Sequence, residues 1–463
     1  MGAQILLLQP RVCAEPAYPL GLASLVPPLQ AEGHQVRGLD LHFTPWEHAL
    51  RQAAQADVVA ITVMTRAVPE VRRFVTALRA RRPQGQMVVI GGPQPSLFPR
   101  ETLTQIGADV AVVGDGTLIL PTLIHSAKSA LPGVVWRDPL EPLLPPPPPS
   151  PPDDWPWPDR EVFPMPAYAL AMRSLALPYT PVVTSRGCRR HCAHCPAPRL
   201  HPTGFQARSP ENVWAEWSWL SKQYGIRDVH LEDDDPFADP ARVVALCERL
   251  IRHPLPLIWE CVNGIPPERL DPTLFPLLAR AGCKLLVMAF EHLRWEETPA
   301  STETLGCSRA QAKRLIHAAE AAGIEVGGYF MVGMPEHTRR EQVSGIMASF
   351  GLGLTRANYS AFQWLPGAQR LVEQEKQGSS QPLAGQARHS SEGLGLDPVK
   401  FGGRPSPRGV QQLSAWAHVG FYLQPRPLKR LLESIWHEPR QLRLLLRKGL
   451  EQVRGAAAAT QAG

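Results

Sequence analysis

Short apolar runs alternate with amphipathic stretches over the first 140 residues of the chain. The runs lie at residues 4–9, 57–63, 87–90 and 110–113, and the stretches between them have helical patterns. Buried parallel strands are continuous apolar runs, and their alternation with helices is typical of a parallel sheet covered by helices. We therefore predict an α/β domain over residues 1–140.

Two glycine-rich loops follow the last two of these runs. Gly91 and Gly92 end the third run, and Gly114, Asp115 and Gly116 end the fourth. Open α/β sheets bind ligands at the carboxyl ends of their strands, where glycine lets the backbone approach a cofactor closely. The two loops are therefore candidates for a binding site.

A proline-rich segment follows this domain. Residues 145–149 are all proline, within a proline-dense stretch from 142 to 158. Such a segment is extended and is excluded from the interior of a sheet. We predict a linker over residues 141–178.

Strand and helix patterns alternate a second time beyond this linker. We predict strands at residues 181–184, 228–231, 257–262, 284–290, 325–332 and 357–363. Six such units suit a partial (β/α)6 barrel of the TIM type over residues 179–375. Residues 376–409 are rich in Gly, Ser, Pro and Gln, which predicts a flexible segment. Residues 410–463 contain Trp and Leu in a helical pattern and predict a helical C-terminal region.

The composition is that of a globular protein without a nucleic-acid-binding arm. The 463 residues include 48 Lys and Arg against 42 Asp and Glu, and the net charge of +6 is spread without blocks of like charge. No apolar run approaches the roughly 18 residues of a membrane span, and residues 1–9 lack a signal-peptide pattern. Five cysteines stand singly, which indicates a reducing compartment. We therefore expect a cytoplasmic protein with no nucleic-acid partner and no membrane span.

Three further cysteines, Cys188, Cys192 and Cys195, form a CxxxCxxC motif in the loop after the first predicted barrel strand. Thiolates stabilise iron–sulfur clusters, and this spacing can hold three corners of a [4Fe–4S] cluster while one iron stays open to a small molecule. The usual zinc spacings consist of two pairs of Cys or His ligands, and no fourth ligand of that kind is near. The alternatives are a structural zinc site, redox thiols, or His191 and His194 as metal ligands.

These features resemble the radical S-adenosylmethionine (SAM) enzymes that carry an amino-terminal cobalamin-binding domain, and among them the class B radical SAM methyltransferases. The resemblance covers residues 4–370 and rests on the cysteine motif and on residues 19–21, 33–40, 91–93, 114–116, 208–211 and 328–338. It implies a Rossmann-like cobalamin-binding domain, a partial barrel and three cofactors: a [4Fe–4S] cluster, SAM and cobalamin. In this family an electron from the cluster cleaves SAM, and the 5′-deoxyadenosyl radical abstracts hydrogen from an unactivated carbon.

The resemblance also implies a set of SAM-binding residues near the ends of the barrel strands. The set consists of His194 near the adenine, Arg208 and Asn263 for the carboxylate, Glu232 and Asp233 for the amino group, and Glu291 for the ribose hydroxyls. Four successive acids at residues 232–235 would be costly if all were desolvated. Glu291 could instead begin a surface helix.

The implied cobalamin contacts lie in the loops of the first domain. They are Leu20, Gly21, Asp40, Thr65, Arg66, Gly91, Gly92, Gly114, Asp115 and Gly116. The DxHxxG signature that supplies a histidine to cobalt is absent, because no glycine stands at the required place after Asp40 and His42. The resemblance therefore implies base-off cobalamin with Thr65 or Arg66 at the lower cobalt face. Arginine cannot ligate a metal, since it stays protonated, and Arg66 could instead cap a helix or contact a phosphate.

Three activities are compatible with the resemblance. The first is methylation of an unactivated carbon of a small-molecule or peptide substrate, through methylcobalamin and a substrate radical. The second is a cyclisation or rearrangement without methyl transfer, and the third is a non-catalytic cobalamin or iron–sulfur sensor. An enzyme of this kind uses an electron donor such as flavodoxin or ferredoxin. We predict the C-methyltransferase.

Overall fold

The computed structural model describes residues 2–11, 16–81, 85–126, 130–137, 143–171, 174–291, 293, 295, 307–334, 337–369, 371–372 and 407–437 of the chain. Its contacts define two compact units, of which the first is Met1–Met172 and the second begins at Arg173. The sequence predicted a boundary at residue 140. No described helix is long and apolar enough to cross a membrane.

The first unit is built on a six-stranded sheet with the order β2-β1-β3-β4-β5-β6, in which only β6 is antiparallel. Its strands are β1 (Gln4–Gln9), β2 (Gln35–Asp40), β3 (Val58–Thr62), β4 (Met87–Gly91), β5 (Val110–Val112) and β6 (Val134–Trp136). The four predicted strands are present, and β2 and β6 were missed. Strand β2 lies at the sheet edge with mixed exposed and buried positions, so it lacks a continuous apolar run.

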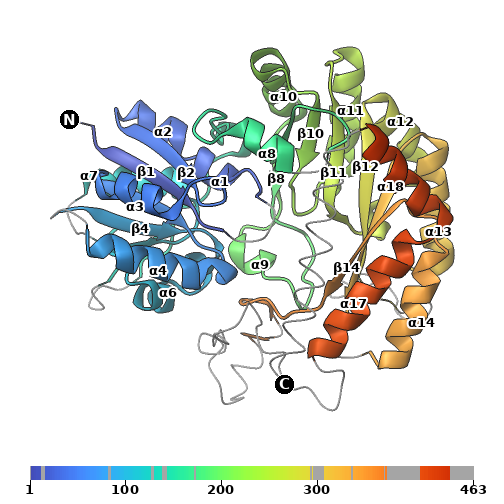
Figure 1. Cartoon of the computed structure of the whole chain (residues 1–463). Coiled ribbons are helices and arrows are strands. Elements are labelled where there is room, and N and C mark those ends of the chain that lie inside the picture. Colours follow the sequence, from blue (N-terminus) through green and yellow to red (C-terminus); the bar gives the residue numbers. More distant parts are fainter. Residues whose placement is uncertain are drawn as a thin grey trace. The chain divides into compact units, whose positions relative to one another are not determined.

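Helices cover both faces of this sheet (Figure 1). They are α1 (Leu20–Ala23), α2 (Val26–Ala31), α3 (Trp46–Ala54), α4 (Val68–Arg79), α5 (Pro93–Leu97), α6 (Pro99–Ile106), α7 (Gly116–His125) and α8 (Met165–Ala171), with 3-10 turns η1 (Thr65–Ala67) and η2 (Pro152–Asp154). Leu6 and Leu8 of β1 pack with α3, α4 and α6, whereas Ile5 and Leu7 pack with α2 and α7. This alternation is the two-residue period of a strand buried on both faces.

Part of the predicted linker belongs to the first unit. Phe163 and Tyr168 are each 1% exposed and pack into the core that contains α2 and α7. The Tyr168 hydroxyl donates a hydrogen bond to Oδ2 of Asp40 at 2.5 Å. The unit therefore extends to Met172, because these aromatic side chains follow the proline tract and complete its core.

The second unit contains a six-stranded, wholly parallel sheet with the order β14-β13-β12-β11-β10-β7. The strands are β7 (Tyr179–Val182), β10 (Asp228–Leu231), β11 (Ile258–Ile265), β12 (Cys283–Glu291), β13 (Glu325–Val332) and β14 (Arg356–Ala361). A small antiparallel pair, β8 (Ser185–Arg186) and β9 (Gln206–Ala207), flanks the cysteine loop. All six predicted strands are present within a few residues, and the partial barrel is confirmed.

Helices follow the strands of this barrel in sequence (Figure 1). They are α9 (Ala197–Leu200), α10 (Pro210–Tyr224), α11 (Pro240–Arg252), α12 (Phe275–Arg280), α13 (Arg309–Ala321), α14 (Arg339–Phe350), α17 (Pro407–Tyr422) and α18 (Pro425–His437), with 3-10 turns η3 (Pro267–Arg269) and η4 (Pro272–Leu274). The Ser209 side chain caps α10 by accepting the N–H of Asn212, and Thr338 and Glu341 form a capping box at α14.

Helix α17 covers the open edge of the barrel at β14. Phe421 and Ala417 are buried, and Nε2 of His418 accepts the backbone N–H of Tyr359 at 3.1 Å. An edge strand presents unpaired N–H groups, and this histidine satisfies one of them. The helical C-terminal region is thus present over 407–437. The predicted flexible segment up to residue 406, and residues 438–463, lie outside the described residues.

Candidate functional site

The cysteine motif lies between β8 and α9, after the carboxyl end of the first barrel strand. Cys188, Cys192 and Cys195 are all free thiols, and Cys192 packs against Ala289 of β12. Gly187 precedes the motif with a φ of +77°, and a side chain there would collide with the carbonyl oxygen of Gly204. Only glycine fits this start of the loop.

The three thiols are desolvated and repel one another as thiolates. Burial raises the pKa of Cys188 to about 12 and that of Cys195 to about 11, and it also raises the pKa of Cys192. Each charged thiolate would repel its neighbours. Bound cations would stabilise three such desolvated thiolates at neutral pH, so this donor set fits a site-differentiated iron–sulfur cluster.

Asp233 anchors the start of the cysteine loop. Its carboxylate is fully buried and accepts hydrogen bonds from the N–H and the hydroxyl of Thr184 and from the hydroxyl of Ser185, each at 2.6 Å. Burial raises the pKa of Asp233, which these hydrogen bonds oppose. In the structure the Asp233 carboxylate is thus hydrogen-bonded to the start of the cysteine loop. Its predicted contact with the amino group of SAM stays a prediction.

Arg208 is engaged in a similar way. Its guanidinium forms an ion pair with Glu216 at 2.5 Å and donates to the Val183 carbonyl at 3.0 Å and to Oδ1 of Asn212 at 2.8 Å. Arg208 and Glu216 are 3% and 1% exposed. Arg242 adds a hydrogen bond to the Thr184 carbonyl at 2.9 Å. These arginines fix the backbone beside the motif, and the predicted contact of Arg208 with the SAM carboxylate stays a prediction.

Glu232 and Asn263 lie together at the ends of β10 and β11. Burial raises the pKa of Glu232, and Asn263 and His230 oppose this shift. Asn263 also donates to the backbone carbonyl of Asp233 at 3.3 Å. Tyr329 of β13 donates to the Val262 carbonyl at 2.8 Å. The ends of these strands therefore present a carboxylate, an amide and a phenol, which can bind the polar groups of a small ligand.

His194 and Glu291 meet at the end of β12. Nε2 of His194 lies 3.6 Å from Oε1 of Glu291, and the Phe362 ring lies 6.1 Å from the His194 ring. Oε2 of Glu291 is buried and has no hydrogen-bond partner among the described residues. Glu291 ends a strand, where the chain has a β-bulge, so the alternative of a surface helix start does not fit. A buried acceptor without a partner fits the ribose hydroxyls of SAM.

Sequence reasoning missed three charged residues next to the cysteines. Arg190, within the motif, forms an ion pair with Glu268 of η3. Oδ2 of Asp235 lies 3.6 Å from Sγ of Cys188. Arg190 could have been suspected from its place between two cysteines, and Asp235 from the acidic run. Glu268 could not have been predicted from the sequence, because it lies in a separate loop that is distant from the motif along the chain.

The predicted cobalamin loops lie at the carboxyl ends of β3, β4 and β5. Gly92 has a φ of +95°, and a Cβ atom there would lie 2.8 Å from Oγ1 of Thr62. The Thr65 hydroxyl donates to Oε1 of Gln94 at 2.8 Å, and Arg66 is exposed. Thr65 is thus tied to the Gly92 loop, and neither side chain has a demonstrated role at cobalt.

The other predicted contacts differ in how much space adjoins them. A Cβ atom at Gly21, beside Leu20, would meet nothing within 4 Å, whereas one at Gly114 would lie 3.1 Å from Pro146. Asp115 caps α7 by accepting the N–H of Thr117, next to Gly116. A Cβ atom at Gly91 would make only an ordinary van der Waals contact, with Val112 at 3.9 Å. The space beside Gly21 and Gly91 is therefore open enough for a flat cofactor to approach the backbone. Cobalamin contacts stay predictions.

Asp40 is the most enclosed of these residues. It is 1% exposed, and its carboxylate pairs with Nδ1 of His42 at 2.8 Å and with the Tyr168 hydroxyl. Both carboxylate oxygens therefore have protein partners, which fixes the loop after β2.

Two family models match the chain. The B12 binding domain matches residues 11–124, and the Radical SAM superfamily matches residues 182–344. An uncharacterised methyltransferase of Pyrococcus horikoshii is 24% identical over 438 residues, which cover 90% of each chain. Cytidylyl-2-hydroxyethylphosphonate methyltransferase of Streptomyces wedmorensis is 24% identical over 428 residues, which cover 79% of each chain.

Solved structures share the fold of this chain. The radical SAM methyltransferase TsrM of Kitasatospora setae, solved with tryptophan and a SAM analogue, gives a TM-score of 0.67 at 23% identity over 82% of this chain and 77% of that chain. The same enzyme with cobalamin and a [4Fe–4S] cluster gives 0.65, with 82% of this chain and 79% of that chain covered.

An α/β ligand-binding domain and a partial barrel with three clustered cysteines define an iron–sulfur enzyme with a second cofactor domain. The chain contains a B12 binding domain followed by a Radical SAM superfamily domain.

Proposed function

We propose that this enzyme methylates an unactivated carbon of a small-molecule or peptide substrate. The observation that carries the proposal is the set of three free thiols, one buried and two half-buried, at the carboxyl end of the barrel, next to a carboxylate oxygen of Glu291 that has no hydrogen-bond partner among the described residues. The B12-binding domain in the same chain supports methyl transfer, and the two relatives described above are methyltransferases by name, whereas two others are cyclases by name.

The proposed site residues bind different cofactors in the two domains. Cys188, Cys192 and Cys195 hold the cluster, while Glu232 and Glu291 bind SAM from the ends of β10 and β12. The glycine loops of the first unit bind cobalamin. When bound, the cluster with SAM supplies a radical that removes hydrogen from a carbon, and cobalamin supplies the methyl group. An electron donor such as flavodoxin or ferredoxin serves the cluster.

The buried polar contacts beside the cysteine loop have a positioning role. The ion pair of Arg208 with Glu216 and the hydrogen bonds that Asp233 accepts from Thr184 and Ser185 hold the backbone at the start of β8. A cluster loop fixed in this way keeps its open iron at a constant place relative to the strand ends.

Turnover stoichiometry tests the proposal. The reconstituted holoenzyme is incubated without oxygen with a reductant, SAM and candidate substrates, and the products are quantified by mass spectrometry. One S-adenosylhomocysteine and one 5′-deoxyadenosine per methylated product support the proposal. 5′-Deoxyadenosine alone indicates a cyclisation or rearrangement, and neither compound indicates a sensor. The C188A variant is the control and should yield neither.

A further inference from the structure

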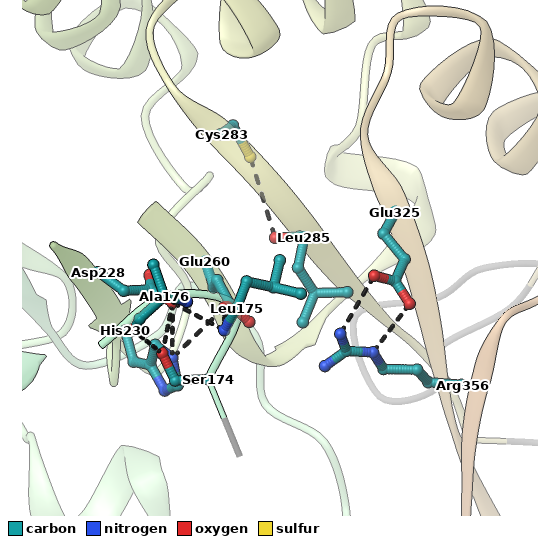
Figure 2. Close-up of polar contacts among 10 residues, drawn as sticks. All are labelled: Ser174, Leu175, Ala176, Asp228, His230, Glu260, Cys283, Leu285, Glu325 and Arg356. Carbon is teal, nitrogen blue, oxygen red and sulfur yellow. Dashed lines mark hydrogen bonds and ion pairs between the residues drawn. The ribbon is translucent and has the colours of Figure 1, made fainter. Parts of the chain in front are cut away.

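Three buried polar residues gather at the amino end of two barrel strands, the end opposite the cysteine loop. Asp228 begins β10, His230 follows two residues later on the same face, and Glu260 of β11 pairs with His230 in the register. Their exposed fractions are 0%, 2% and 1%. Figure 2 shows the three side chains together beside residues 174–176.

Residues 174–176 hold one oxygen of each carboxylate. Oδ2 of Asp228 accepts hydrogen bonds from the Ser174 hydroxyl at 2.7 Å and from the Leu175 N–H at 3.1 Å, and Oε1 of Glu260 accepts from the same N–H at 2.9 Å. Oδ1 of Asp228, Oε2 of Glu260 and Nε2 of His230 have no hydrogen-bond partner among the described residues. Buried polar atoms are rarely left unsatisfied, so three in one cluster require a further ligand.

The distances within the cluster are longer than hydrogen bonds. Nε2 of His230 lies 3.5 Å from Oδ2 of Asp228 and 3.6 Å from Oε1 of Glu260. A hydrogen bond between such atoms spans about 2.9 Å, and one N–H cannot point at both oxygens. Ligands at about 2.05 Å from a tetrahedral cation lie about 3.3 Å apart. One ligand atom of each side chain lies within 4.8 Å of the other two, as an ion between them would require.

The charges of the two carboxylates also need to be neutralised. Two buried carboxylates need two positive charges, because an uncompensated buried charge costs several kcal/mol. Two protons or one divalent cation can therefore neutralise the site. Arg356 does not supply the charge, since it is paired with Glu325 at 2.9 Å (Figure 2).

We propose that Asp228, His230 and Glu260 bind a divalent transition-metal ion, with zinc as the expected ion. Magnesium and calcium prefer oxygen ligands, and magnesium usually keeps several waters that this buried site does not admit. Two carboxylates and one imidazole suit zinc, and the second oxygen of one carboxylate completes four ligands. The hydrogen bonds from residues 174–176 orient the ligating carboxylates. The ion ties the segment that enters the barrel to β10 and β11.

A second group with similar composition lies in the first unit and provides a comparison. Glu32, His34 and His125 also have ligand atoms within 4.8 Å of one another. However, the Ala3 N–H donates to Nδ1 of His34 at 3.0 Å. A neutral imidazole that accepts at Nδ1 carries its proton on Nε2, so Nε2 of His34 is not available as a ligand, although it has no hydrogen-bond partner among the described residues. We expect no ion at this group.

Metal analysis of the full-length, reconstituted protein tests the proposal. We expect about one equivalent of zinc per chain, in addition to the cluster iron, by mass spectrometry of the metals. Glu260→Gln and Asp228→Asn keep the side-chain shape and should each reduce zinc to below about a tenth of an equivalent with the iron unchanged. Glu325→Gln, at a half-buried carboxylate of the barrel, and His125→Gln, at the comparison group, are matched controls that should keep the zinc.

Zinc in an empty cysteine site would mimic this result, and a second measurement separates the two. A variant with alanine in place of Cys188, Cys192 and Cys195 is loaded with cobalt(II). Visible ligand-field bands without a thiolate charge-transfer band, lost on adding Glu260→Gln, support the proposal. Wild-type protein that contains cluster iron but no further divalent metal overturns the proposal. Two protons would then neutralise Asp228 and Glu260. Zinc that persists in both single variants also overturns the proposal. If neither variant folds, the metal content of the wild-type protein decides between the two outcomes.

Discussion

Nε2 of His194 lies 3.6 Å from Oε1 of Glu291, so the cysteine loop and the end of β12 meet at one ionisable contact. Glu291 has a φ of +39°, which is rare for a residue with a side chain, and its other carboxylate oxygen has no partner among the described residues. Strained backbone is found most often at functional sites, where the surrounding structure enforces it. We therefore expect Glu291 to bind a ligand, as the sequence predicted.

Replacement of Glu291 by Gln should weaken SAM binding by about tenfold to a hundredfold, because hydrogen bonds to a charged acceptor contribute about 1.5–3 kcal/mol. Equilibrium dialysis of SAM against the reconstituted protein measures this. Cluster iron should not change, since the cysteines are untouched. Glu291→Gly should weaken binding as much and raise the unfolding free energy by about 1 kcal/mol, because glycine relieves the positive φ. Unchanged SAM affinity in both variants would remove Glu291 from the site.

The substitution Asp233→Ala should destabilise the barrel by about 3 kcal/mol, since it leaves the three donors from Thr184 and Ser185 without an acceptor. The cysteine loop begins at these donors, so cluster iron should fall as well. Denaturant unfolding and iron analysis measure the two effects. Asp154→Ala, at an exposed acid in η2, is the control and should leave both values unchanged. A fully loaded cluster in Asp233→Ala would show that the loop does not depend on this anchor.

Alkylation of the cluster-free protein should be slow at Cys188. Burial raises the pKa of this thiol from the usual 9.0 to about 12, so the thiolate is about a thousandfold scarcer than in the unfolded chain below pH 9. The raised pKa favours the folded state below pH 9, and this contribution is lost as the pH rises through 9 toward 12. The rate of iodoacetamide modification against pH, with and without denaturant, measures the shift. Equal rates in both states would show an unburied thiol.

The barrel strands could be predicted because buried parallel strands are continuous apolar runs between glycine and proline signals. The strand at Gln35–Asp40 could not, since it is an edge strand with exposed positions. The boundary was placed at the proline tract, but Phe163 and Tyr168 lie beyond that tract and still complete the first core. Composition marks where a chain is extended, and it does not show which core the following aromatic residues enter.

The cysteines could be predicted from spacing alone, since their chemistry depends on residue type. The partners of Asp233 and Arg208 could not, because Thr184 and Glu216 are ordinary polar residues whose role depends on three-dimensional contact. The group Asp228, His230 and Glu260 gave no signal either, since its members come from two strands 30 residues apart. Sequence patterns therefore predict ligands that are close along the chain better than networks formed by folding.

Gly21 and Gly92 should respond differently to valine. Open space adjoins Gly21, so Gly21→Val should fold normally and project its side chain into that space, which would weaken cobalamin binding by about tenfold or more. Gly92 has a positive φ, and its Cβ would collide with Thr62, so Gly92→Val should destabilise the first unit by about 2 kcal/mol. Hydroxocobalamin titration and thermal unfolding separate the two effects. Normal cobalamin affinity in Gly21→Val would place the cofactor elsewhere.

The first unit should fold alone only if it extends to Met172. Phe163 and Tyr168 fill its core, and Tyr18 donates to the Asp159 carbonyl at 2.7 Å, so a fragment that ends at residue 144 lacks these contacts. Loss of a buried aromatic side chain costs about 3–5 kcal/mol, which approaches the whole stability of a small domain. We expect fragment 1–172 to unfold cooperatively and to bind hydroxocobalamin in the base-off form, as absorbance will show.

Fragment 1–144 should show neither cooperative unfolding nor cobalamin binding. Phe163→Ala within fragment 1–172 tests the same argument without truncation, and it should lower the unfolding free energy by about 3–5 kcal/mol. Leu143→Ala is the control, because Leu143 is 41% exposed and its loss should change stability by less than about 0.5 kcal/mol. If fragment 1–144 binds cobalamin as tightly as fragment 1–172, the segment after the proline tract is dispensable for the first unit. If fragment 1–172 folds but binds none, the cofactor also needs residues of the second unit.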